Sequence, residues 1–405
     1  MKSGRQFRAA VSRRWSAVAV ALAISLAAPL WAQSSRVFRE GNAWVEETAG
    51  ALPAGHEFRT STDLGSLRVQ GNSSQVTYVV RKRSDADSEE AARRQFQQLR
   101  ITASKVGDAV VLEGKLIGRG VNRMAAEFMV QIPRLTQVVK VETRTGALSL
   151  NSIAGSVTGL TGAGNVKVDD MSGPVKIISN GGNMEAGNVT SDLFLQSGGG
   201  NISVERVTGQ LFIKTGGGRV KIGTAGATTV ETGAGNVDVN RCSGDLHASS
   251  GGGNLNIGDV SGTVSAETGG GTVRLGSAQG DVQVVTGGGA VELMKVGQGA
   301  HVETGAGPIT VQFVAARGQF RDSYLHTAAG NLVVYLPRDL GVDVHASTEL
   351  ASGAGIKSDF PGLGISSEGG QYGPKSMFGE GHLNGGGPIL RLRTTIGQIE
   401  IRRSQ

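Results

Sequence analysis

The chain repeats one short pattern of hydrophobic and polar positions along most of its length. A threonine or serine is followed three residues later by glycine, and then by two hydrophobic residues that flank a polar one, as in TGAGNVKV from Thr161. The pattern starts at Thr143, Thr161, Ser179, Ser197, Thr215, Thr232, Ser250, Thr268, Thr286, Thr304 and Thr327. Eight of the ten steps are 18 residues, one is 17 and the last is 23. A fixed period of this length predicts a stack of similar structural units.

Each repeat contains two predicted strands. When the threonine or serine is counted as position 0, positions 5 and 7 are hydrophobic and position 6 is mostly polar, which is the alternation of a strand with one buried face. Positions 14 and 16 are hydrophobic in most copies and define the second strand, and position 10 is a further inward site. Because each strand meets its counterpart one coil later, we expect parallel pairing between neighbouring copies. Coils spaced by about 4.8 Å would make a rod on the order of 50 Å long.

These patterns predict an all-β fold: a single-stranded parallel β-helix, or β-solenoid, of about 18 residues per coil, with a short helix inserted near its N-terminal end. A left-handed β-helix would show three equivalent six-residue units in each coil. The inward positions here do not divide in that way, so we expect right-handed winding. Glycines at positions 1 to 3 predict a tight corner with positive φ. The hydroxyl at position 0 should point inward there and satisfy backbone groups of the turn. We expect a similar ladder from the asparagines at position 4.

The flanks divide the chain into four parts. Residues 1–32 resemble a signal peptide, with a basic start, an apolar run over Ala17–Leu30 and small residues for cleavage before Gln33. Residues 33–142 should form an N-terminal cap and the first coils, and residues 143–340 the regular repeats. Residues 341–405 should form an irregular C-terminal cap and the last coil.

Single copies of the pattern, and one predicted helix, occur in these flanks. Thr62–Val69 fits an early coil and Thr395–Ile401 a final one. A helix is predicted over Ser84–Leu99, where Asp87 and Glu90 resemble a capping box. Because the ends of a solenoid expose unpaired strand edges, we expect this helix and the segment Ser352–Asn384 to cover them.

Charge and cysteine content narrow the classes of function. The formal charge of +6 includes five basic residues of the signal, so the mature chain holds 35 basic and 34 acidic residues. A near-neutral chain lacks the electrostatic footprint of a nucleic-acid binder. The single cysteine, Cys242, excludes an internal disulfide. Because the chain begins with a signal-like segment, we expect export to the periplasm, to the outer cell surface or into the medium. No stretch after that segment is apolar enough to span a membrane.

The glycine-rich corners resemble two ligand-binding motifs, and the sequence argues against both. A phosphate-binding loop needs a helix after the glycines, whereas TGAGN is followed by a strand. The calcium-binding nonapeptide repeat needs an aspartate two residues after its last glycine, and that position is inward and apolar here. We therefore expect turn glycines and no cofactor.

Histidine, cysteine and glutamate are the residue types in the repeats that could form a chemical site. His247 and His301 share outward position 15 but lie three coils apart, about 14 Å, which is too far for one metal ion. Cys242 falls on inward position 10 and is expected to be a buried thiol. Glu267 and Glu303 share outward position 17, as does Glu231, and a gap of about 9.6 Å is near the upper separation for an inverting glycosidase pair. We expect no metal site and no catalytic residues.

One outward feature differs from the other copies. Phe194 and Phe212 stand at position 15 in adjacent coils, where other copies have Lys176, Thr229 and His247. Either a flanking loop or the predicted helix covers these rings, or they form a small strip that binds a partner or a glycan.

The repeated [TS]-G-[AG]-G-N-V-x-V unit behind a signal-like segment resembles the family of bacterial exported putative adhesins of unknown function. GIKSDFP (Gly355–Pro361) and NGGGPILRLRTTIGQIEI (Asn384–Ile401) are similar to the C-terminal part of that family. The resemblance implies a non-enzymatic adhesive or structural module of the cell envelope, with an envelope component, a glycan or a protein surface as partner. The alternatives are a polysaccharide-acting β-helix enzyme and a self-assembling envelope scaffold.

Overall fold

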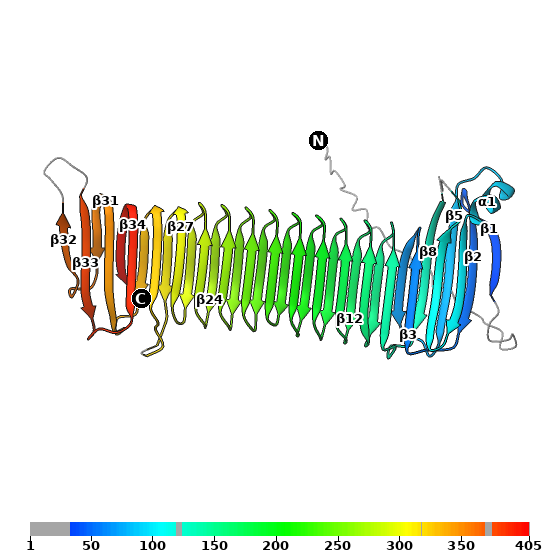
Figure 1. Ribbon diagram of the computed structural model, residues 1–405, viewed down its shortest axis with the longest axis horizontal. Coiled ribbons are helices and arrows are strands. Elements are labelled where there is room, and N and C mark those ends of the chain that lie inside the picture. Colours follow the sequence, from blue (N-terminus) through cyan, green and yellow to red (C-terminus); the bar gives the residue numbers. More distant parts are fainter. Residues whose placement is uncertain (1–32, 119–123, 317, 369–374, 405) are drawn as a thin grey trace, which may run out of the picture.

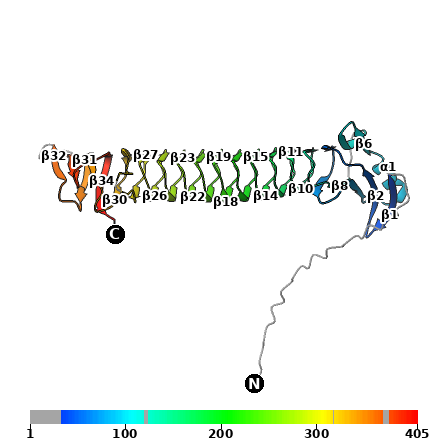
Figure 2. The same ribbon diagram turned by 90° about the horizontal axis from the view of Figure 1, so that it is seen from below.

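The computed structural model describes residues 33–118, 124–316, 318–368 and 375–404, which form one long rod of β-strands (Figure 1). The predicted signal segment lies outside these residues. Figure 2 shows that the strands of the central part lie in two layers that face each other along the rod. The prediction of an all-β, solenoid-like fold with many parallel strands and one short helix is confirmed.

Each central repeat contributes one strand to each layer. Sheet 1 contains the strands that begin at position 5: β10 (Leu148–Ile153), β12 (Val166–Met171), β14 (Met184–Val189), β16 (Ile202–Val207), β18 (Val220–Ala225), β20 (Val237–Cys242), β22 (Leu255–Val260), β24 (Val273–Ala278), β26 (Val291–Val296), β28 (Ile309–Phe313) and β30 (Leu332–Leu336). Sheet 2 contains the strands that lead to position 0: β9 (Val138–Thr143), β11 (Ser156–Thr161), β13 (Val175–Ser179), β15 (Leu193–Ser197), β17 (Leu211–Thr215), β19 (Thr228–Thr232), β21 (Leu246–Ser250), β23 (Val264–Thr268), β25 (Val282–Thr286), β27 (Ala300–Ala306) and β29 (Ser323–Ala329).

Strands pair in parallel with their counterparts in the next repeat. Partners lie 18 residues apart in most pairs, as for Val166 and Met184 in β12 and β14. The step between β17 and β19 is 17 residues, since Leu211 pairs with Thr228. The hydrophobic positions 5, 7, 10, 14 and 16 are buried between the two sheets, as predicted. The right-handed winding stays a prediction.

The inward hydroxyls form the predicted ladder at the glycine-rich corner. Thr161 is buried, and its Oγ1 donates to the carbonyl oxygen of Gly146 in the preceding coil at 3.0 Å. The same oxygen accepts the amide of Gly164 in its own coil at 3.2 Å. Equivalent pairs of bonds recur at Ser197, Thr215 and Thr268. Each hydroxyl thereby satisfies two turn groups that would otherwise be buried without partners.

The asparagine ladder at position 4 is also present. Asn165 Oδ1 accepts the backbone amide of Asn183 at 3.1 Å, and Asn183 Oδ1 accepts that of Asn201 at 2.9 Å. Asn236 and Asn254 make the same bond to the following coil. The corner is therefore tied to its neighbours by side-chain oxygens at positions 0 and 4.

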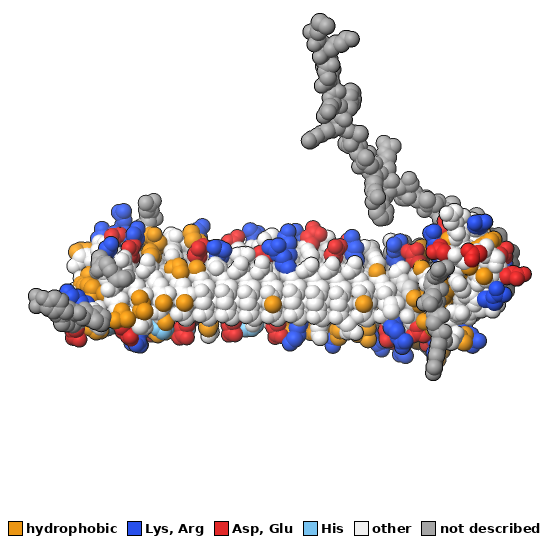
Figure 3. Space-filling view, turned by 90° about the horizontal axis from the view of Figure 1, so that it is seen from above, with side chains coloured by type: hydrophobic (Ala, Val, Ile, Leu, Met, Phe, Trp, Pro, Cys, Tyr) orange, Lys and Arg blue, Asp and Glu red, His pale blue; other side chains and the backbone are white. Residues whose placement is uncertain are grey.

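The glycines at this corner serve a purpose other than the one predicted. Of the position 3 glycines in the coils that the structure describes, only Gly65, Gly307 and Gly397 have φ between +20° and +160°. In the others the constraint is proximity: a Cβ built on Gly218 would lie 2.0 Å from the carbonyl oxygen of Gly200. Position 3 thus requires glycine because the backbones of adjacent coils touch there. Figure 3 shows a stripe along the rod that has few hydrophobic side chains and is bordered by charged residues, as expected for a corner of Gly, Ser, Thr and Asn.

The N-terminal end extends both sheets. It comprises β1 (Ser34–Glu40), β2 (Ala43–Leu52), β3 (Glu57–Thr62), β4 (Ser66–Gly71), β5 (Val76–Ser84), α1 (Glu89–Phe96), β6 (Leu99–Val106), β7 (Ala109–Leu116) and β8 (Met124–Ile132). Sheet 1 continues from β10 through β4, β8, β5 and β2 to β1, and sheet 2 continues from β9 through β3 and β7 to β6. The predicted early coil, β3 and β4, therefore lies between β7–β8 and β9–β10.

The helix is shorter than predicted. Ser84, the first residue of the predicted range, is the last residue of β5, and the N-cap is Ser88 rather than Asp87, with Ser88 Oγ accepting the amide of Ala91. The helix packs against β2, β5 and β6 through buried Ala92 and Phe96. Buried Lys82 joins Glu46 at 2.8 Å and the carbonyl of Phe96 at 3.0 Å, so a cation satisfies the C-terminal end of α1.

The C-terminal end is built from strands where an irregular cap was predicted. Most of the described part of Ser352–Asn384 lies in β31 (Val342–Ser358), β32 (Gly364–Glu368) and β33 (Ser376–Leu383), and β34 (Ile389–Arg403) follows. β34 pairs in parallel with β29 and β30 on one side and with β31 on the other. The inward hydroxyl of the final coil belongs to Thr394, not Thr395, because Thr394 Oγ1 donates to the Gly330 carbonyl at 3.0 Å.

A pair of alanine substitutions tests the contact between corners. We expect Gly218→Ala to lower the free energy of unfolding by about 1–3 kcal/mol, because the added methyl overlaps the Gly200 carbonyl. Gly217→Ala is the matched control, since nothing lies within 4 Å of its Cβ position, and it should stay within about 1 kcal/mol of the parent. Denaturant unfolding measures both. Equal effects would contradict the proximity argument.

A second substitution tests the hydroxyl ladder. Thr268→Val keeps the side-chain shape but removes the bonds to Gly253 O at 2.8 Å and from Gly271 N at 3.2 Å. We expect a loss of about 1–3 kcal/mol in the free energy of unfolding, because buried backbone groups lose their partners. Thr268→Ser keeps the hydroxyl and should retain most of the stability. A Val variant as stable as the Ser variant would show that the ladder does not contribute.

Candidate functional site

One concave feature is a groove along the outer face of sheet 2. It has a volume of about 690 Å³ and runs over seven consecutive coils, from β11 to β23. Its floor is the outward row at position 15, and one edge is the row at position 13, in the turn that precedes each strand. We call it the ring groove, after Phe194 and Phe212, and its lining includes Lys176, Asp192, Gln210, Thr229, Asp245 and His247.

Phe194 and Phe212 form a stacked pair on the floor of the ring groove. Their centroids are 4.9 Å apart and their planes differ by 4°, because the residues are directly paired in β15 and β17. Lys176 Nζ lies over the outer face of Phe194, 5.2 Å from its centroid, in a cation–π contact. Both rings are half-buried. Helix α1 contacts β2, β5 and β6, so the cover expected from the predicted helix is not over these rings.

The acidic residues on the groove edge tie one coil to the next. Asp192 Oδ1 accepts the amide of Gln210 at 2.8 Å. Asp245 Oδ1 accepts both the amide and the hydroxyl of Thr263, at 2.8 and 2.9 Å. The bonds from Thr263, of which the backbone bond has the larger effect, lower the pKa of Asp245. The groove edge therefore carries a fixed, ionised carboxylate at Asp245 at neutral pH.

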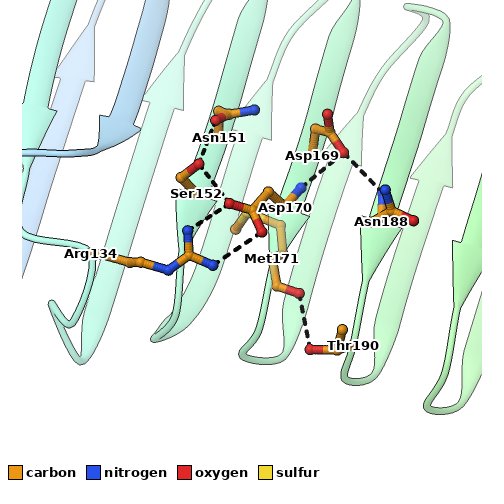
Figure 4. Close-up of polar contacts among 8 residues, drawn as sticks. All are labelled: Arg134, Asn151, Ser152, Asp169, Asp170, Met171, Asn188 and Thr190. Carbon is orange, nitrogen blue, oxygen red and sulfur yellow. Dashed lines mark hydrogen bonds and ion pairs between the residues drawn. The ribbon is translucent and has the colours of Figure 1, made fainter.

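A second polar cluster joins the N-terminal end to the first regular coils (Figure 4). Arg134, which follows β8, makes a two-point ion pair with Asp170 at 2.6 and 3.0 Å. Ser152 donates to the same carboxylate at 2.7 Å. The Arg134 bond, followed by that from Ser152, lowers the pKa of Asp170. Ser152 and Asp170 both have left-handed φ, 58° and 52°. Every group here has a partner within the protein, so the cluster fastens coils together.

The other chemical candidates remain dispersed. His247 donates to or accepts from Ser265 at 3.2 Å, and His301 contacts Glu303 at 3.1 Å. Within the described residues no three histidine, cysteine, aspartate or glutamate side chains gather in a way that could hold a metal ion. Cys242 is buried, and its Sγ contacts the carbonyl of Gly226 at 2.9 Å.

The outward glutamates do not form a close pair. In the register of sheet 2, Ser249 separates Glu231 from Glu267, and Val285 separates Glu267 from Glu303. Glu231 instead pairs with Lys214 at 2.7 Å. None of the three lines the ring groove.

Sequence reasoning found the floor of the groove and missed its edge. Phe194 and Phe212 were recognised because they break the polar character of position 15. Asp192, Gln210 and Asp245 share position 13, and the same period could have grouped them. They were missed because position 13 lies in the turn between the two strands of a repeat, where the alternation of hydrophobic and polar residues gives no signal.

No helix among the described residues has both the length and the apolar character needed to cross a bilayer. No family model matches the chain, and no curated protein matches it.

Solved structures of bacterial proteins do match. A putative cell adhesion protein from Clostridium sporogenes is 10% identical, with 89% of this chain and 100% of that chain covered and a TM-score of 0.20. A putative adhesin from Parabacteroides merdae is 12% identical, with 72% and 96% covered and a TM-score of 0.27. A putative lipid binding protein from Parabacteroides distasonis is 14% identical, with 73% and 98% covered and a TM-score of 0.26. Neighbours described as adhesins agree with the resemblance carried by the repeat.

The pKa of Asp245 offers a test of the groove edge. Thr263→Val removes the hydroxyl bond but keeps the backbone bond, so the pKa of Asp245 should rise part of the way toward its ordinary value. A depressed pKa contributes stability that is present above the unfolded pKa and is lost as the pH falls through the folded pKa. The variant should therefore lose less stability on acidification. Carboxyl NMR titration measures the shift, and an unchanged or lower pKa would contradict this assignment.

Proposed function

We propose that this chain is an exported, non-enzymatic β-solenoid of the bacterial cell envelope that acts as an adhesive or structural module. The rod in this proposal is a right-handed parallel β-helix of about 18 residues per coil. The observation that carries the proposal is the ring groove, in which two stacked aromatic rings lie on an outward face that α1 does not contact. Its partner is an envelope component, a glycan or a protein surface.

The architecture supports a binding role because the groove is rigid before any partner arrives. Each floor residue sits on a strand that is paired on both sides, and each edge aspartate is held by the next coil. A preorganised surface loses little conformational entropy on binding. Outward aromatic side chains in a groove with a few placed polar groups are typical of ligand sites.

The test replaces both rings. Phe194→Ser/Phe212→Ser should leave the free energy of unfolding within roughly 1–2 kcal/mol of the parent, because both rings are only half-buried and outside the core. The same variant should lose binding of the tagged mature protein to envelope fractions of the producing bacterium, measured by co-sedimentation. Met294→Ser/Val314→Ser is the matched control, because it removes two exposed apolar side chains that do not line the groove.

Two results would overturn the proposal. One is a wild-type protein that binds no envelope material. The other is a double phenylalanine variant that unfolds more easily but binds as before, which would make the rings structural.

A further inference from the structure

One coil of the ring groove departs from its neighbours at several points together. It is the coil of β19, where the repeat is 17 residues instead of 18 and the missing residue falls in the turn before the strand. The groove edge is reduced to Ala227 in this turn, between Gln210 and Asp245 in the adjacent coils. The floor is reduced to Thr229, between Phe212 and His247. Edge and floor are therefore lowered in the same coil, which makes a notch across the groove.

The notch lies where the aromatic stack stops. Lys176 covers one end of the stack, whereas the face of Phe212 away from Phe194 looks toward Thr229. Phe212 and His247 are two coil steps apart, about 9.6 Å, since stacked strands are about 4.8 Å apart. A flat group placed midway would be about 4.8 Å from each ring position, within the range that aromatic neighbours prefer. It would match the 4.9 Å between Phe194 and Phe212 and occupy the place of a missing ring.

Three polar side chains border this space, two on the groove edge and one on the floor. Gln210 and Asp245 are exposed on the edge at either side of Ala227, and the Thr229 hydroxyl is on the floor. Thr263 uses Oδ1 of Asp245, so Oδ2 is the oxygen that can accept a bond from a ligand. A group that fits must combine an apolar flat face with hydroxyl donors around its rim. A pyranose ring has this combination, whereas an aromatic side chain of a protein partner would leave these polar groups without partners.

The charges around the notch exclude an acidic sugar. The Asp245 carboxylate stands at its edge and Asp192 lies two coils away on the same edge, while the nearest cation on the floor, Lys176, lies over the far side of the phenylalanine pair. A uronate or sulfated sugar would place like charges together at Asp245. We propose that the notch over Thr229 binds one pyranose ring of a neutral oligosaccharide, stacked on the free face of Phe212 with its hydroxyl groups bonded to Asp245 and Gln210.

This inference rests on the proposed function and names its ligand class. The probes are neutral oligosaccharides of glucose, galactose and N-acetylglucosamine, with oligogalacturonate as the acidic comparison, and calorimetry measures affinity. Wild-type protein should bind at least one neutral probe more tightly than the acidic one. Thr229→Phe, which fills the notch, should weaken that binding about tenfold or more, since a lost stacking contact alone is close to one factor of ten.

Thr310→Phe is the matched control, because it adds the same side chain at an outward position of β28 in sheet 1, outside the ring groove. It should leave the affinity unchanged, and both variants should retain wild-type unfolding. The inference is overturned if no neutral probe binds, if the acidic probe binds best, or if Thr229→Phe binds like wild type. Envelope binding that depends on Phe194 and Phe212 but not on any free sugar would point to a protein partner and leave the proposed function standing. The proposed function itself would fail by a different result, namely that wild-type protein binds no envelope material.

Discussion

The close contact between the glycine-rich corners of adjacent coils is the constraint on which the rest of the rod depends. A Cβ at position 3 would fall about 2 Å from the carbonyl oxygen of the coil below, as at Gly218. Because the backbones meet there, turn amides and carbonyls have no access to water, and the inward hydroxyl at position 0 supplies the missing partners. Glycine and threonine or serine therefore recur together for one physical reason. A Cβ at position 2 would project into open space, as at Gly217, which explains why alanine occurs there at Ala163 and Ala234.

At both ends of the rod the order of the strands in the sheets departs from their order in the sequence. At the N-terminal end the chain forms β3 and β4, moves outward through β5 to β8, and returns at β9 on the inner side of β3. At the C-terminal end it moves outward to β31, β32 and β33 and returns as β34, which lies between β31 and the regular coils. In each case a coil is held between strands distant in sequence. Such an arrangement opposes fraying, because the inserted coil cannot leave without separating pairs on both of its sides.

The regular coils could be predicted from the sequence because their period, alternation and side-chain roles repeat eleven times. Parallel pairing, the buried faces and the ladders at Thr161 and Asn165 all follow from that repetition. The ends could not be predicted so well, because crossed strand order depends on contacts between distant segments and leaves no periodic signal. The helix was predicted to begin too early, because Ser84 is paired with Trp44 as the last residue of β5 and the hydroxyl of Ser88 caps the helix four residues later. The role of the glycines was misassigned because close approach and positive φ select the same residue.

The candidate site follows from the same regularity. Inward positions are fixed by packing, and the corner is fixed by backbone contact, so only the outward rows and the turn before sheet 2 are free to vary between coils. Phe194, Phe212 and Thr229 are changes on such a row, and Ala227 is a change in such a turn. The 17-residue coil shows how far the framework tolerates variation: Thr228 replaces the usual hydrophobic residue, and its buried hydroxyl donates to the Gly226 carbonyl at 3.0 Å. Because this local bond satisfies the shortened turn, the neighbouring coils keep their register while the surface above them is lowered. The missing residue in the turn before β19 therefore alters only that coil. It changes the shape of the groove and leaves the pairing of the strands in the rod intact.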